Sequence, residues 1–162
     1  MTARLMTAAL AIAVMLPLAA ARGQQPSTGL AAKPAYVPGL AEFMTFAQIR
    51  HAKLWLAGAA GNWELADYQI DELKEGLEDT AKLVPTYKNM PIGKMMESIM
   101  DAPIADVEKV IKAKDRTKFA VAFDRLTVAC NACHQATNRG FIVIQRPSNS
   151  AFPNQSFAAP RQ

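Results

Sequence analysis

The chain has few of the residues from which most active sites are built. It contains two cysteines and two histidines in 162 residues, and it has no glycine-rich phosphate-binding loop. A Ser/His/Asp triad would have to use one of those two histidines. The acids Asp101, Asp106 and Glu108 are typical of helix ends and surfaces. We therefore expect no enzymatic turnover.

A strong excess of charge is also missing. The formal net charge is +4 at pH 7 and charged residues make up 20% of the chain. The basic residues are scattered along the sequence and do not alternate with aromatic residues. This balance predicts neither nucleic-acid binding nor strong attraction to a charged membrane surface.

Long apolar runs are absent beyond the N-terminal segment. In residues 1–21 the only charge is Arg4, an almost wholly apolar stretch follows over residues 5–18, and Ala19–Ala21 offers a small-residue cleavage site. This pattern is typical of a secretory signal peptide, and the apolar run is short for a membrane span. We expect a periplasmic protein without membrane insertion. Residues 22–37, rich in Ala, Gly, Gln and Pro, are expected to form a disordered leader.

The two cysteines are close together, in the pentapeptide Cys130-Asn131-Ala132-Cys133-His134. Two cysteines three apart followed by histidine are the attachment pattern of c-type haem. Each thiol forms a thioether with one haem vinyl group, and the adjacent imidazole reaches the iron. Apolar residues recur here at three- and four-residue steps, so the three side chains share one helical face. The motif predicts one haem c per chain, with Cys130 and Cys133 as attachment points and His134 as proximal iron ligand.

Two other uses of the cysteines compete with haem attachment. A thioredoxin-like pair is expected at a helix N-terminus near a βαβ pattern, whereas this pair lies late in a helix with no strand before it. A structural zinc site is the stronger alternative, because Cys130, Cys133, His134 and His51 make a complete Cys₂His₂ set. The composition leaves zinc open.

The periodicity of apolar residues predicts four amphipathic helices. The first covers residues 38–60 and ends at Gly61, and the second begins after the cap Asn62 and ends before Pro85. The third region is expected to break near residues 101–103, and the fourth to run from the cap Asp115 to a stop at Gly140. Short connections favour an all-α, antiparallel up-down-up-down four-helix bundle over residues 38–140. Residues 141–144 are expected to form a short strand within an extended tail, residues 141–162, for which two arrangements are open: it lies over the bundle, or it is a loosely packed terminus.

His51 lies on the apolar seam of the first predicted helix. A histidine among core positions is costly unless its ring nitrogens find partners, and an iron would supply one. His51 is therefore our candidate for the distal iron ligand, with Met44, one heptad earlier, in reserve. Arg125 and Arg139 are candidates for contacts with the haem propionates. The methionine cluster, Met90, Met95, Met96 and Met100, is best explained as adaptable packing.

A four-helix protein with its Cys-x-x-Cys-His on the final helix resembles the cytochrome c′ family, the class II c-type cytochromes. The resemblance covers roughly residues 38–140, and its specific part is Cys130, Cys133 and His134. It implies covalent haem c, a proximal His134, a periplasmic location and, in many members, a homodimer. Members leave the sixth iron position open or screened by an apolar residue, or fill it with a first-helix methionine. The presence of His51 departs from that pattern.

Three functions follow as hypotheses. The first is a one-electron carrier that exchanges electrons with redox partner proteins, its iron held by His134 and His51. The second is a binding module for nitric oxide or carbon monoxide, in which the sixth position is open or displaceable. The third is an exported helical bundle stabilised by zinc.

Overall fold

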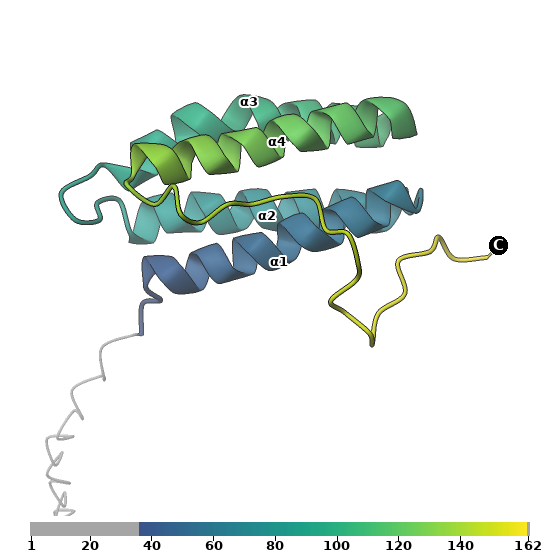
Figure 1. The fold of residues 1–162 in the computed structure, drawn as a ribbon, viewed down its shortest axis with the longest axis horizontal. Helices are drawn as coiled ribbons and strands as arrows, with labels where there is room; N and C mark the ends of the chain where they lie inside the picture. The colour runs from purple at the N-terminus through teal and green to yellow at the C-terminus, as the bar shows by residue number, and fades with distance from the viewer. Residues whose placement is uncertain (1–35, 162) are drawn as a thin grey trace, which may run out of the picture. The chain divides into compact units, whose positions relative to one another are not determined.

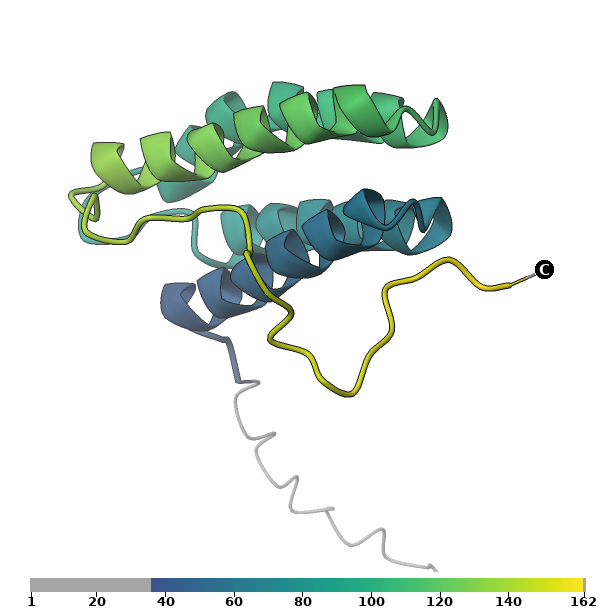
Figure 2. The ribbon, with the colours of Figure 1, turned by 45° about the vertical axis from the view of Figure 1, so that its right-hand side comes forward.

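The computed structural model describes residues 36–161. The predicted signal segment, residues 1–21, and the leader as far as residue 35 lie outside the described residues. Four helices follow one another: α1 (Leu40–Ala59), α2 (Trp63–Leu83), α3 (Ile92–Lys112) and α4 (Arg116–Ala136). In two views, α1 and α2 form one layer and α3 and α4 the other (Figures 1 and 2). The predicted all-helical four-helix arrangement is confirmed.

The helix boundaries follow local signals in the sequence. The side chain of Asn62 accepts a hydrogen bond from the backbone N–H of Leu65 and begins α2, and Asp115 accepts one from Lys118 and begins α4. Gly61 makes the tight turn between α1 and α2 at a φ of 74°, a backbone conformation that glycine adopts without strain. α2 ends two residues before Pro85. These predicted starts and stops are confirmed.

Two predicted features of the helices are wrong. α3 is continuous through Pro103, where we expected a break. One buried face extends through the proline at helical spacing, and it includes Met100, Ile104 and Val107. Burying such side chains stabilises by about 1.5–3 kcal/mol each, which together exceeds the cost of about 3 kcal/mol for an interior proline. The fourth helix ends at Ala136, and Asn138 rather than Gly140 takes the left-handed conformation, with a φ of 59°.

Aromatic side chains gather in the core where α1, α2 and α4 approach the α1–α2 turn. Phe119 and Phe123 are buried there, and the ring centroids of Trp55 and Phe123 lie 5.1 Å apart. Trp63 packs edge-on against Phe119 at 5.9 Å. Gly58 lets α1 and α4 approach each other, because a Cβ atom at that position would overlap the Phe119 ring. We call this region, Trp55, Gly58, Trp63, Phe119 and Phe123, the aromatic end.

The segment after α4 forms no strand within the described residues, so the strand predicted over residues 141–144 is wrong. The tail nevertheless lies on the bundle, along the side where α1 and α4 face each other (Figures 1 and 2). Phe157 packs against the core, and Asn62 donates a hydrogen bond to the carbonyl of Ala158 at 3.1 Å. None of the helices in residues 36–161 has the length and apolar character that a bilayer crossing requires.

Candidate haem site

The motif residues lie in the last two turns of α4 and face a cavity. The cavity has a volume of about 290 Å³, and Cys130, Cys133 and His134 all line it. Its other lining residues are mostly apolar, from all four helices and the tail. The volume is just below the usual range of about 300–1,000 Å³ for small-molecule sites. The structure thus places both thiols and the imidazole at one largely apolar cavity, as the helical spacing predicted.

The opposite wall of the cavity comes from the first half of α1. Met44 and His51, the two candidates for the sixth iron position, both line it, one heptad apart. α1 and α4 contact each other far less than the other neighbouring helices do. The space between them therefore lies where a ligand would be held by one helix on each side. Both candidate ligands and the attachment motif belong to this one site.

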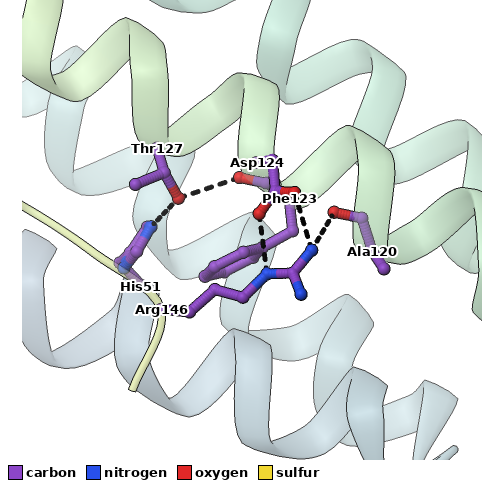
Figure 3. A network of polar contacts seen from close by, with 6 residues as sticks. All are labelled: His51, Ala120, Phe123, Asp124, Thr127 and Arg146. Carbon is purple, nitrogen blue, oxygen red and sulfur yellow. Dashed lines mark hydrogen bonds and ion pairs between the residues drawn. The ribbon is translucent and has the colours of Figure 1, made fainter. Parts of the chain in front are cut away.

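His51 is buried, with 3% of its surface exposed. Its Nε2 lies 2.8 Å from the hydroxyl oxygen of Thr127, and that hydroxyl donates to the carbonyl of Phe123 at 2.9 Å (Figure 3). Because the hydroxyl proton is used in the second bond, His51 Nε2 is the donor in the first. The ring also packs on Phe123, with centroids 4.4 Å apart. Burial lowers the pKa of His51 to about 4, so the imidazole is neutral at pH 7.

This hydrogen bond determines how His51 can serve an iron. Its Nε2 is bound to Thr127, so ligation through Nε2 requires that bond to break, whereas Nδ1 carries the free lone pair of this tautomer. Sequence reasoning missed Thr127. Its position three residues before Cys130, on the same helical face as the motif, was the signal that could have found it.

The environment of the thiols disfavours thiol–disulfide chemistry. Burial, followed by the charge of Cys133, raises the pKa of Cys130 to about 12. Burial also raises the pKa of Cys133. The thiolate is the reactive form of cysteine, and catalytic thiols have lowered pKa values. The folded chain therefore holds both sulfurs as protonated groups against the cavity, which suits attachment points better than redox catalysts.

The part of the chain that the structure describes contains no preformed zinc site. Within residues 36–161, no group of three or more His, Cys, Asp or Glu side chains is arranged to hold a metal ion. His51, the fourth ligand of the proposed Cys₂His₂ set, is bonded to Thr127 instead. A tetrahedral zinc site would need His51 to leave that bond and the motif residues to converge.

The two arginines predicted to contact the haem propionates lie in different parts of the structure. Arg139 lines the cavity, and its guanidinium lies 4.8 Å from the centroid of the Tyr87 ring. Arg125 does not line the cavity. It is exposed on α4 and lies 3.6 Å from a carboxylate oxygen of Asp106 on α3. Of these two arginines, Arg139 alone is therefore close enough to the site to meet a carboxylate there.

The methionine cluster is divided between packing and the cavity. Met96 and Met100 are buried in α3 and line the cavity, whereas Met90 and Met95 are half-buried. The tail also lines the cavity, through Ile142 and Ile144. Sequence reasoning left open whether the tail lies over the bundle, and it could not identify these two contacts, because no periodicity carries through the tail.

The residues present fit haem c. Two thiols and an imidazole line a largely apolar cavity from one helix, and a second helix faces them with a histidine and a methionine. An apolar wall, a sulfur pair and axial nitrogen or sulfur donors are what covalent haem needs from a protein. No protein-family model, curated protein or solved structure matches the chain. The resemblance to cytochromes c′ therefore depends on the motif and its place on the last of four helices.

Proposed function

We propose that the chain is an exported monohaem c-type cytochrome that acts as a one-electron carrier. Cys130 and Cys133 attach the haem, His134 is the proximal iron ligand and His51 is the distal ligand. The observation that carries this proposal is the shared cavity, because all four residues line it from two facing helices. The bound haem would supply an iron that gains or loses one electron. Its partners are redox proteins, and no catalytic turnover is part of the proposed role.

The surroundings of the cavity support electron transfer. Apolar side chains of α1, α2, α3 and the tail make up most of the cavity lining, and the neutral His51 adds no charge. A site that keeps its ligands in both oxidation states needs little rearrangement, and the aromatic end fixes α1 against α4 below the cavity. Two imidazole ligands are expected to hold the reduction potential below that of a His/Met site. The periplasmic location follows from the predicted signal segment.

One observation favours a second candidate, a binding module for nitric oxide or carbon monoxide. The hydrogen bond from His51 Nε2 to Thr127 competes with iron ligation. If that bond persists with haem present, the distal side keeps an open position enclosed by α1. In this alternative His51 lines the gas pocket without bonding the metal, and Met44 is its neighbour.

The absorption spectrum of the matured full chain tests the proposal. The chain is produced in bacteria that carry a c-type haem attachment system, and the protein is denatured and washed with acid acetone. We expect haem to remain on the chain, and to be lost in the variant Cys130→Ala/Cys133→Ala. A colourless wild-type product with one zinc per chain would establish the third hypothesis and contradict the proposal.

Spin state separates the two haem functions. We expect a low-spin spectrum in the wild type, a change to high spin in His51→Ala, and no change in Met44→Ala. A high-spin ferrous wild type that binds carbon monoxide rapidly would favour the gas-binding module. An unchanged spectrum in His51→Ala would show that His51 is not the sixth ligand.

A further inference from the structure

The chain reverses direction directly after the motif. Asn138 takes the left-handed conformation, and the N–H of Arg139 donates to the carbonyl of His134 at 2.7 Å, the bond that closes a Schellman motif. A second turn follows at once, in which the N–H of Ile142 donates to the carbonyl of Arg139 at 2.8 Å. Two successive turns thus return the tail to the end of α4.

This return brings a backbone carbonyl to the predicted axial ligand. Nδ1 of His134 lies 2.8 Å from the carbonyl oxygen of Ile142. A carbonyl only accepts hydrogen bonds, so Nδ1 carries the proton and Nε2 keeps its lone pair. The bond therefore selects the tautomer in which Nε2 can bind a metal, and it fixes the rotation of the ring.

A residue of the motif itself holds the tail in this position. Asn131, the first residue between the two cysteines, donates from its side-chain amide to the carbonyl of Ile144 at 2.8 Å and accepts from the N–H of Ile144 at 2.8 Å. The side-chain amide thus makes both hydrogen bonds with the Ile144 backbone that a neighbouring β-strand would otherwise make. Ile144 is two residues after Ile142, so this pair of bonds sets the position of the Ile142 carbonyl.

A second anchor follows immediately. Arg146 makes two bonds of 2.7 Å to the carboxylate of Asp124 and a third to the carbonyl of Ala120 (Figure 3). Its guanidinium also lies 4.3 Å from the ring centroid of Trp55 on α1. The tail is therefore attached to both helices that enclose the cavity, and the Ile142 carbonyl lies between the Arg139 turn and these anchors.

We propose that residues 139–146, which form the turn after α4 and the start of the tail, position the axial ligand His134. The Ile142 carbonyl orients His134, and Asn131 is the positioning residue that holds this carbonyl in place. The statement about the iron rests on the proposed function, whereas the hydrogen bond and its control by Asn131 do not. By accepting the hydrogen bond from Nδ1–H, the carbonyl raises the basicity of Nε2 and would so favour an oxidised iron.

The variant Asn131→Ala tests the proposal in the haem-loaded full chain. We expect the reduction potential to rise, and the Nδ1 proton of His134 and the amide proton of Ile144 to exchange with water about tenfold faster, as for the loss of one net hydrogen bond. The control is Ala132→Ser at the other, exposed variable position of the motif, which should leave both quantities unchanged. Unchanged proton exchange in Asn131→Ala would overturn the proposal.

A second measurement separates this inference from the proposed function. If the wild-type chain carries no haem, the haem function fails, and nitrogen-15 NMR of the haem-free chain then reports the tautomer of His134. We expect the Nδ1–H form, and a shift toward the Nε2–H form in Asn131→Ala. A dominant Nε2–H form in the wild-type chain would contradict the positioning role whatever the protein binds.

Discussion

The two ends of the bundle are filled in different ways. The aromatic end is packed by Phe119, Phe123, Trp55 and Trp63, and a missing Cβ at Gly58 is needed to close it. The opposite end contains the cavity, lined by methionine, isoleucine, cysteine and histidine side chains. One end is therefore closely packed, whereas the other leaves a cavity between the helices. Changes at the two ends should therefore have unequal effects on the haem-free chain.

The largest expected contrast is between Phe119→Ala and Met44→Ala, each made in the Cys130→Ala/Cys133→Ala background. Removing the buried phenyl ring leaves a cavity in dense packing, so we expect a loss of about 4 kcal/mol in the free energy of unfolding. Met44 is only half-buried and already lines a cavity, so its truncation should cost less than about 1 kcal/mol. Urea unfolding followed by circular dichroism measures both. Equal losses would refute the distinction between the ends.

The second prediction concerns pH and His51, which lies between the two ends. In the unfolded chain His51 binds a proton below a pH of about 6.5. In the folded chain it binds that proton only near its lowered pKa of about 4. Stability due to His51 is therefore complete above a pH of about 6.5 and falls as the pH drops to about 4, by about 3 kcal/mol in total.

The matched variant for this test is His51→Gln, which does not titrate and keeps an N–H donor for Thr127. The free energy of unfolding of the haem-free chain is measured at several pH values from neutral down to the lowered pKa. It should fall more steeply with decreasing pH in the wild type than in His51→Gln, because only the wild type has the buried imidazole. Parallel curves for the two chains would mean that His51 is not buried as a neutral group.

The third prediction compares two helical glycines. Gly58→Ala places a methyl group against the Phe119 ring and should destabilise the protein by about 2 kcal/mol through overpacking. Gly76→Ala, on an exposed position of α2 with no neighbouring atom within 4 Å, should stabilise it by about 0.5–1 kcal/mol. Thermal unfolding of both variants gives the two signs directly. A neutral Gly58→Ala would show that α1 and α4 can separate at the aromatic end.

The parts of the fold that depend on neighbouring residues could be predicted from the sequence. The caps Asn62 and Asp115 and the turn at Gly61 are local chemistry, and they are confirmed. The break predicted at Pro103 was wrong because burying one continuous face of α3 outweighs the local tendency of proline to break a helix. The stop at Gly140 was wrong because Asn138 takes the left-handed position first.

The candidate site was likewise predictable only in part from the sequence. Helical periodicity placed Met44 and His51 on one seam and the motif residues on one face, and the structure brings these together at the cavity. The partner of His51 is 76 residues away in the sequence, and the carbonyl that meets His134 comes from an irregular tail. Such contacts depend on the three-dimensional packing, which no local pattern encodes.

The sparse contact between the first and last helices has a consequence for loading the cavity. α1 with α2 and α3 with α4 form two helical hairpins, which are joined mainly through α2 and α3. Opening the α1–α4 side would leave the contacts between α2 and α3 intact, but it would break the His51–Thr127 bond and the packing of Trp55 on Phe123. A flat, rigid molecule would enter edge-on through that opening, and the tail, which lies along the same side, must move aside first.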